Sequence, residues 1–154
     1  MSVVAAVRPD GQIIPLLLHV AGAATLVGGL LAGSSVLVYA RNDPRFLRLG
    51  YWTLLAVTLP GWVLMRVGAQ WIYSEQGWDD LPEGFDEPVW LTTGFIVAEG
   101  GGLILLISLI VGGIGVYRLR EGKGAGLLKV TLVLAFVLLA AYVIAAWAMA
   151  GKPD

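Results

Sequence analysis

The chain has no cysteine, and His19 is its only histidine among 154 residues. Without cysteine it can form no disulfide, bind no metal through thiolates and use no cysteine nucleophile. Charged side chains are scarce as well, at 14% of the sequence, against about 25% in an ordinary soluble domain. Hydrophobic residues make up 58%. This composition indicates an integral membrane protein and gives no sign of nucleic-acid binding.

Apolar residues gather in long runs, and these predict the fold. The runs cover residues 13–40, 49–73, 89–117 and 127–150. Each exceeds the ~20 residues that a helix needs to cross about 30 Å of hydrocarbon, and none shows the period-two alternation of a membrane strand. We therefore expect a single all-α domain over residues 1–154, an up-down-up-down bundle of four transmembrane helices.

The basic residues predict how this bundle is oriented. Those of the first and third connections are Arg41, Arg45, Arg48, Arg118, Arg120, Lys123 and Lys129, and only Arg8 and Lys152 lie at the other end. Basic loops stay in the cytoplasm, so both termini are expected outside a cell (inner) membrane. The second connection, between residues 75 and 87, is strongly acidic. It is either a solvated loop or a lid that attracts cations.

Three ionisable side chains interrupt the apolar runs: His19, Arg66 and Glu99. Ionisable residues at bilayer depth are costly and are functional candidates by default. At 1.5 Å per residue they lie roughly 9, 10 and 15 Å below the outer ends of their helices. Arg66 and Glu99 lean toward one another, because their helices run in opposite directions. We expect a buried ion pair inside the bundle, which either fixes helix register or meets a ligand, ion or proton.

Polar neighbours extend this predicted layer. Gln70 and Trp62 lie one turn to either side of Arg66, and Tyr142 in the last helix reaches a similar depth. The candidate ligand-binding residues are Arg66, Glu99, His19, Gln70, Tyr142 and Trp62. His19 shares its helix face with Pro15, Gly22, Leu26, Gly29 and Gly33, a pattern typical of close helix packing. It is therefore expected to face the bundle, either as a hydrogen-bonded packing residue or as a metal or haem ligand.

The segment from Leu18 to Gly29, LHVAGAATLVGG, resembles the first helix of bacterial integral membrane proteins of the copper-resistance-D type and of the DUF2269 group. That helix commonly carries a histidine, then Gly-Ala, then a Gly-Gly pair. Here Leu26 and Val27 replace the usual aromatic residue before the Gly-Gly pair, and no second intramembrane histidine exists. The resemblance implies a bacterial envelope protein of four or more helices and carries over only His19, as a candidate ligand.

Two functions of different classes remain open. The preferred hypothesis is a non-enzymatic bundle that binds or transports a ligand, or serves as an accessory subunit, through a buried Arg66/Glu99/His19 layer open to the outer side. A cation, a proton or a neutral amphiphile is favoured over an anion, which the acidic connection would repel. The alternative is a redox protein that binds haem or copper through His19, with Met65 or Met149 as a soft partner.

No cofactor is favoured by the sequence, and no nucleophile–base–orienter set indicates an enzyme. The expected partners are the lipid bilayer and other membrane proteins. Glycine-rich faces on the first and third spans offer contact surfaces, and a homodimer is the expected assembly.

Overall fold

The computed structural model describes residues 13–77 and 88–151. Its elements are α1 (Ile13–Tyr39), α2 (Pro44–Thr53), η2 (Leu54–Thr58), α3 (Leu59–Glu75), α4 (Val89–Arg118), η4 (Leu119–Glu121) and α5 (Ala125–Gly151). Because α2, η2 and α3 follow one another directly, the described chain contains four helices long and apolar enough to cross a membrane. The predicted all-α class and its four apolar spans are confirmed.

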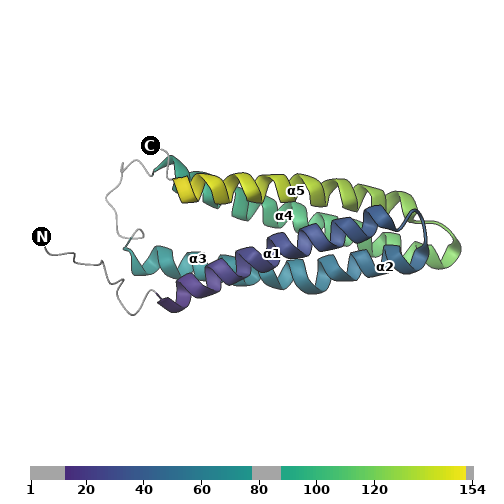
Figure 1. Cartoon of the computed structure of the whole chain (residues 1–154), viewed down its shortest axis with the longest axis horizontal. Helices are drawn as coiled ribbons and strands as arrows, with labels where there is room; N and C mark the ends of the chain where they lie inside the picture. The colour runs from purple at the N-terminus through teal and green to yellow at the C-terminus, as the bar shows by residue number, and fades with distance from the viewer. Residues whose placement is uncertain (1–12, 78–87, 152–154) are drawn as a thin grey trace, which may run out of the picture.

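The helices pack as two antiparallel pairs, α1 with α3 and α4 with α5 (Figure 1). Helix α1 also contacts α5, whereas the backbones of α3 and α4 lie farther apart and are linked by side chains. We call the end of the bundle that carries Ile13, Glu75, Val89 and Gly151 the open end. The opposite end, where the arginine-rich connections lie, is the basic end. Which end faces the cytoplasm stays a prediction from the sequence.

The second span begins at Pro44, five residues before the expected start at position 49. The Asp43 side chain accepts a hydrogen bond of 2.8 Å from the backbone N–H of Arg45, and Pro44 occupies the first turn. Both features favour helix initiation. Arg45 and Arg48, both expected in the connection, therefore belong to the helix itself.

A single π turn, η2, lies in the middle of this span. The backbone N–H of Leu59 bonds to the carbonyl of Leu54, five residues earlier. Pro60 has no N–H to give and its ring crowds the carbonyl four residues before it, so a widened turn here relieves the contact.

Close glycine contacts hold α1 against the second span. Gly22 faces the backbone of Met65, and Gly61 faces the backbone of Leu26 from the opposite side. An added Cβ at either glycine would overlap main-chain atoms. The face predicted for α1 is confirmed at Pro15, Gly22, Leu26, Gly29 and Gly33, which are all buried. Small residues here let the helix backbones approach closely, as is common in membranes.

The α4–α5 pair is joined by polar contacts toward the basic end. The Ser108 hydroxyl donates to the Thr131 carbonyl at 3.4 Å, and the Thr131 hydroxyl reaches the Ser108 carbonyl at 3.3 Å. Tyr51 of α2 packs on Gly112, so the two helix pairs meet closely at this end. The Ser108 and Thr131 hydroxyls thus have hydrogen-bond partners inside the bundle, and the Thr131 hydroxyl also lies 3.1 Å from the Leu127 carbonyl.

Candidate functional site: a cavity at the open end

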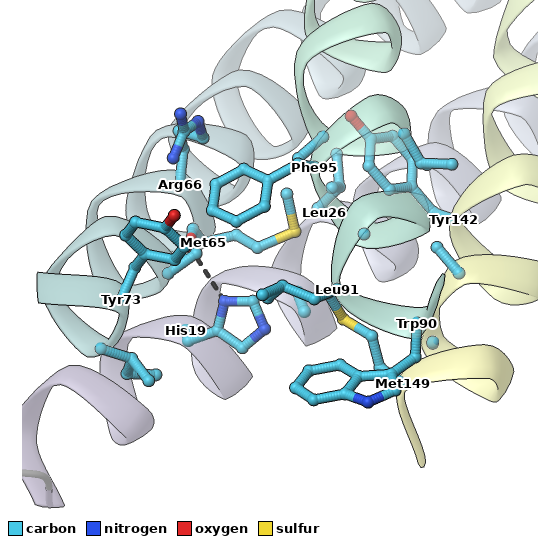
Figure 2. A pocket seen from close by; sticks show the side chains of 18 of the residues that line it. His19, Leu26, Met65, Arg66, Tyr73, Trp90, Leu91, Phe95, Tyr142 and Met149 are labelled. Carbon is cyan, nitrogen blue, oxygen red and sulfur yellow. Dashed lines mark hydrogen bonds between the residues drawn. The ribbon is translucent and has the colours of Figure 1, made fainter. Parts of the chain in front are cut away.

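A cavity of about 310 Å³ lies between the two helix pairs at the open end. Helices α1, α3, α4 and α5 all contribute to its wall, which is mainly apolar. The side chains that line the cavity include His19, Met65, Trp90, Phe95, Tyr142 and Met149, which are labelled in Figure 2. Small residues in the lining, among them Ala69, Ala98 and Ala145, leave space that larger side chains would fill, whereas the Met149 side chain packs on Gly94. The volume falls at the lower end of the range, about 300–1,000 Å³, of small-molecule sites.

His19 supplies a fixed polar group to this apolar wall. Its Nδ1 lies 3.0 Å from the carbonyl oxygen of Met65 (Figure 2). A carbonyl can only accept, so Nδ1 carries the proton and donates it. In the neutral imidazole Nε2 is then a hydrogen-bond acceptor. Figure 2 shows this second nitrogen on the side of the ring that faces Trp90 and Met149, within the cavity lining.

Tyr142 and Trp62 lie deeper in the bundle. Tyr142 lines the cavity and its ring packs on Gly101. Its buried hydroxyl lies near the Trp62 indole but makes no hydrogen bond of good geometry within the described part of the chain. Trp62 donates from Nε1 to the carbonyl of Ala98 at 2.9 Å and does not line the cavity. It bridges α3 and α4 below the cavity, so its role is in packing.

Arg66 and Glu99 form the predicted contact, but not in the predicted place. Arg66 Nη2 lies 2.8 Å from Glu99 Oε1, and Arg66 Nη1 donates to Gln70 Oε1 at 3.1 Å. The side chains of Arg66 and Glu99 are 24% and 65% exposed, so the expectation of a buried ion pair inside the bundle is wrong.

The error has a geometric cause. The depth of a residue along its helix follows from its number. Whether it faces the bundle or the lipid also depends on how the helix is rotated about its own axis. At 100° per residue, Glu99 lies roughly 140° around α4 from the buried face of Gly94, Gly101 and Leu105. Its carboxylate therefore projects from the bundle at the margin of the α3–α4 contact.

A second hollow, of about 340 Å³, lies outside this ion pair and opens on the surface. We call it the α3–α4 groove; its lining is Arg66, Gln70, Tyr73, Thr92, Phe95, Ile96 and Glu99. Phe95 lines both hollows, with the Arg66 guanidinium 5.3 Å from its ring centroid and the Tyr73 ring edge-on at 5.1 Å. These three side chains form the wall between cavity and groove.

The predicted site residues thus divide between different places. His19 and Tyr142 line the cavity, Arg66 lines both hollows, and Gln70 and Glu99 line only the groove. The layer predicted from the sequence is not a single buried site. The acidic connection lies largely outside the described residues, at positions 78–87.

Sequence reasoning did not identify Tyr73, Trp90 or Phe95 as residues that line the cavity. An aromatic residue that lines a cavity carries no distinct sequence signal, because aromatic belts at membrane interfaces use the same residue types.

The described residues include few candidate metal ligands that lie close together. Residues 13–77 and 88–151 hold no group of three or more histidine, aspartate or glutamate side chains placed to share an ion. His19, Met65 and Met149 do line one cavity. Copper or haem ligation by His19 therefore stays a prediction.

Comparisons with protein-family models, curated proteins and solved structures find no match to this chain. The resemblance of the first span to copper-resistance-D-type proteins stays an expectation, based on that segment alone.

Proposed function

We propose that this small multi-pass membrane protein binds an uncharged amphiphile in the cavity at its open end. The observation that carries the proposal is an apolar cavity between four helices in which His19 presents Nε2 as a hydrogen-bond acceptor. Pockets for small ligands combine such apolar walls with a few fixed polar groups. The role is one of binding or transport and needs no chemical step.

The position of Glu99 favours an uncharged ligand among the classes that the sequence left open. A carboxylate in the wall would support a cation, but Glu99 lines the groove and not the cavity, whereas the cationic Arg66 does line the cavity. An uncharged molecule needs no counter-charge. A hydroxyl head group would donate to His19 Nε2, while its alkyl or ring portion would contact Leu91, Phe95 and Met149.

The direction of entry follows from the distribution of basic residues. Under the positive-inside rule the open end faces outward. The ligand then enters from the outer side, near Trp90, and stops beside His19 and Arg66. Trp71, which donates to Glu75 at 3.2 Å, lies at the same end of α3.

A pair of probes tests the role of His19. 4-Octylphenol has a hydroxyl donor, whereas its methyl ether has the same ring and chain without one. Binding to the purified protein in nanodiscs is measured for both. A hydrogen bond worth about 0.5–1.5 kcal/mol corresponds to about a 2- to 12-fold preference for the phenol. The preference should vanish in His19→Phe.

A second comparison tests whether the probes bind in the cavity. Ala146 lines the cavity, so Ala146→Trp should fill it and weaken both probes. Ala140 is exposed on the same helix and is not part of the lining; Ala140→Trp is the matched control and should bind as the wild type does. Equal binding by the two tryptophan variants, or no saturable binding by the wild type, would refute the proposal.

The second candidate is the haem or copper protein, favoured by the presence of His19, Met65 and Met149 in one cavity wall. Soft sulfur and imidazole ligands suit copper(I). A visible absorption spectrum and metal analysis of the purified protein separate the two candidates, since a haem gives a Soret band.

A further inference from the structure

The α3–α4 groove presents charge on a surface that would otherwise face lipid. Glu99 lies ten residues into α4 and Arg66 nine residues before the end of α3, so both are about 14–15 Å from the helix ends. At such depth, charged side chains almost always face protein or a water-filled cavity. An isolated chain would leave the carboxylate of Glu99, with its side chain 65% exposed, toward hydrocarbon.

The surroundings of the ion pair are those of a helix contact surface. Exposed apolar side chains flank it, with Ile96 and Leu103 on α4 and Val67 on α3. Gly100, next to Glu99, is exposed, and an added Cβ there would meet no atom within 4 Å. Another helix can therefore approach the α4 backbone closely at this point.

We propose that the α3–α4 groove is the contact surface for a second copy of this chain, related to the first by a two-fold axis along the membrane normal. Rotation about such an axis leaves the depth of each residue in the membrane unchanged. It places the α3 side of the groove in one copy opposite the α4 side in the other. Because Arg66 and Glu99 lie side by side at one depth, each Arg66 then faces the Glu99 of the second copy. The result is a closed ring of four alternating charges, in an interface that uses the same surface on both chains.

Spare hydrogen-bonding capacity supports this arrangement. Glu99 Oε1 accepts from Arg66, and a carboxylate offers a second oxygen. Of the five N–H donors of Arg66, the contacts to Glu99 and Gln70 use two. Guanidinium and carboxylate groups also suit bidentate pairing. Each copy can thus complete the hydrogen bonding of the other.

Charge balance favours a second copy over other occupants. The ion pair is neutral overall, so it has no net attraction for an anionic lipid head group. A zwitterionic head group would have to descend about 14 Å along the helices. The inference does not depend on amphiphile binding, because the cavity lies on the other side of Phe95.

The absence of cysteine makes a direct test available. Single substitutions Ile96→Cys and Leu103→Cys place a thiol on the groove side, where the native side chains are 66% and 62% exposed. Ile144→Cys on α5, 60% exposed, is the matched control. Each variant is oxidised with copper phenanthroline in vesicles at a low ratio of protein to lipid. We expect at least a five-fold higher disulfide-linked dimer fraction at one or both groove positions than at the control.

A second arm tests the charges. In the Ile96→Cys background, Glu99→Gln should lower the cross-linked fraction several-fold, whereas Thr92→Val, an uncharged change at the groove, should leave it unchanged. Circular dichroism and a monodisperse elution profile establish that each variant is folded.

Two results would overturn the proposal. One is equal cross-linking at the groove and control positions. The other is native mass spectrometry that finds one copy of the chain per nanodisc, either alone or with a lipid or an unrelated protein bound.

Discussion

Gly22→Ala tests whether close backbone packing between α1 and α3 stabilises the fold. Gly22 is buried, and a Cβ added there would overlap the backbone of Leu64 and Met65. Gly28 lies on the same helix, and a Cβ there would meet no atom within 4 Å. Gly28→Ala is therefore a matched control, because it makes the same chemical change without the steric conflict.

The structure predicts the sign and size of the difference in free energy of unfolding between the two variants. Both substitutions gain helix propensity, about 0.5–1 kcal/mol. Only Gly22→Ala forces the backbones apart, which at overpacked sites costs typically about 1–3 kcal/mol and sometimes more. Main-chain atoms cannot rotate away as a flexible side chain can, so we take the upper part of that range. The two variants should differ by about 2–3 kcal/mol, or about 30-fold or more in the unfolding equilibrium.

The assay is reversible unfolding in mixed micelles of dodecyl sulfate and a mild detergent, followed by circular dichroism. Gly28→Ala should unfold at the wild-type detergent fraction or above it, and Gly22→Ala well below it. The reasoning is wrong if the two variants have equal free energies of unfolding.

Two of the three further predictions use the same unfolding titration. Thr131→Val removes a hydroxyl that lies 3.3 Å from the Ser108 carbonyl and 3.1 Å from the Leu127 carbonyl of its own helix. It should lower the free energy of unfolding by about 0.6–1.7 kcal/mol; an unchanged free energy would show that this hydroxyl does not stabilise the bundle. Trp62→Phe keeps a ring but loses the bond to the Ala98 carbonyl, and should cost about 1 kcal/mol in the same titration. Alkaline phosphatase, which is active only outside the cytoplasm, should be active when fused after Gly151; activity of a cytoplasm-only reporter there would reverse the orientation.

The fold was predictable to the extent that length and apolarity determine it. Each of the four apolar runs is long enough to cross a bilayer as a helix. In lipid, a helix pairs all the backbone hydrogen-bonding groups of such a run internally. The packed face of α1 was also predictable, because Gly22, Gly29 and Gly33 share one side of the helix. The start of α2 was not, since apolarity marks where hydrocarbon begins, while the Asp43 cap and Pro44 begin the helix earlier.

The candidate site was predictable only in part. Residue counts placed Arg66 and Glu99 at matching depth, and their contact of 2.8 Å is confirmed. Counts along separate helices do not determine how those helices rotate against each other, so the outward position of Glu99 was missed. The cavity depends on the spacing between helix pairs. Gly94, in its wall, packs on the flexible side chain of Met149, and its sequence context does not distinguish it from Gly22, which packs on main chain.

The uneven contact between the two helix pairs has a mechanical consequence. The pairs touch through α1 and α5 and at the basic end, where Tyr51 packs on Gly112, whereas α3 and α4 are linked by side chains such as Trp62 and Arg66. The closely packed glycines make the α1–α3 pair stiff, so the cavity changes volume when one pair rotates against the other about the basic end. Over a helix about 40 Å long, a 5° rotation displaces the open ends by about 3 Å. Such a rotation would change the distance between Glu75 and Val89, which spin labels at these two helix ends can measure.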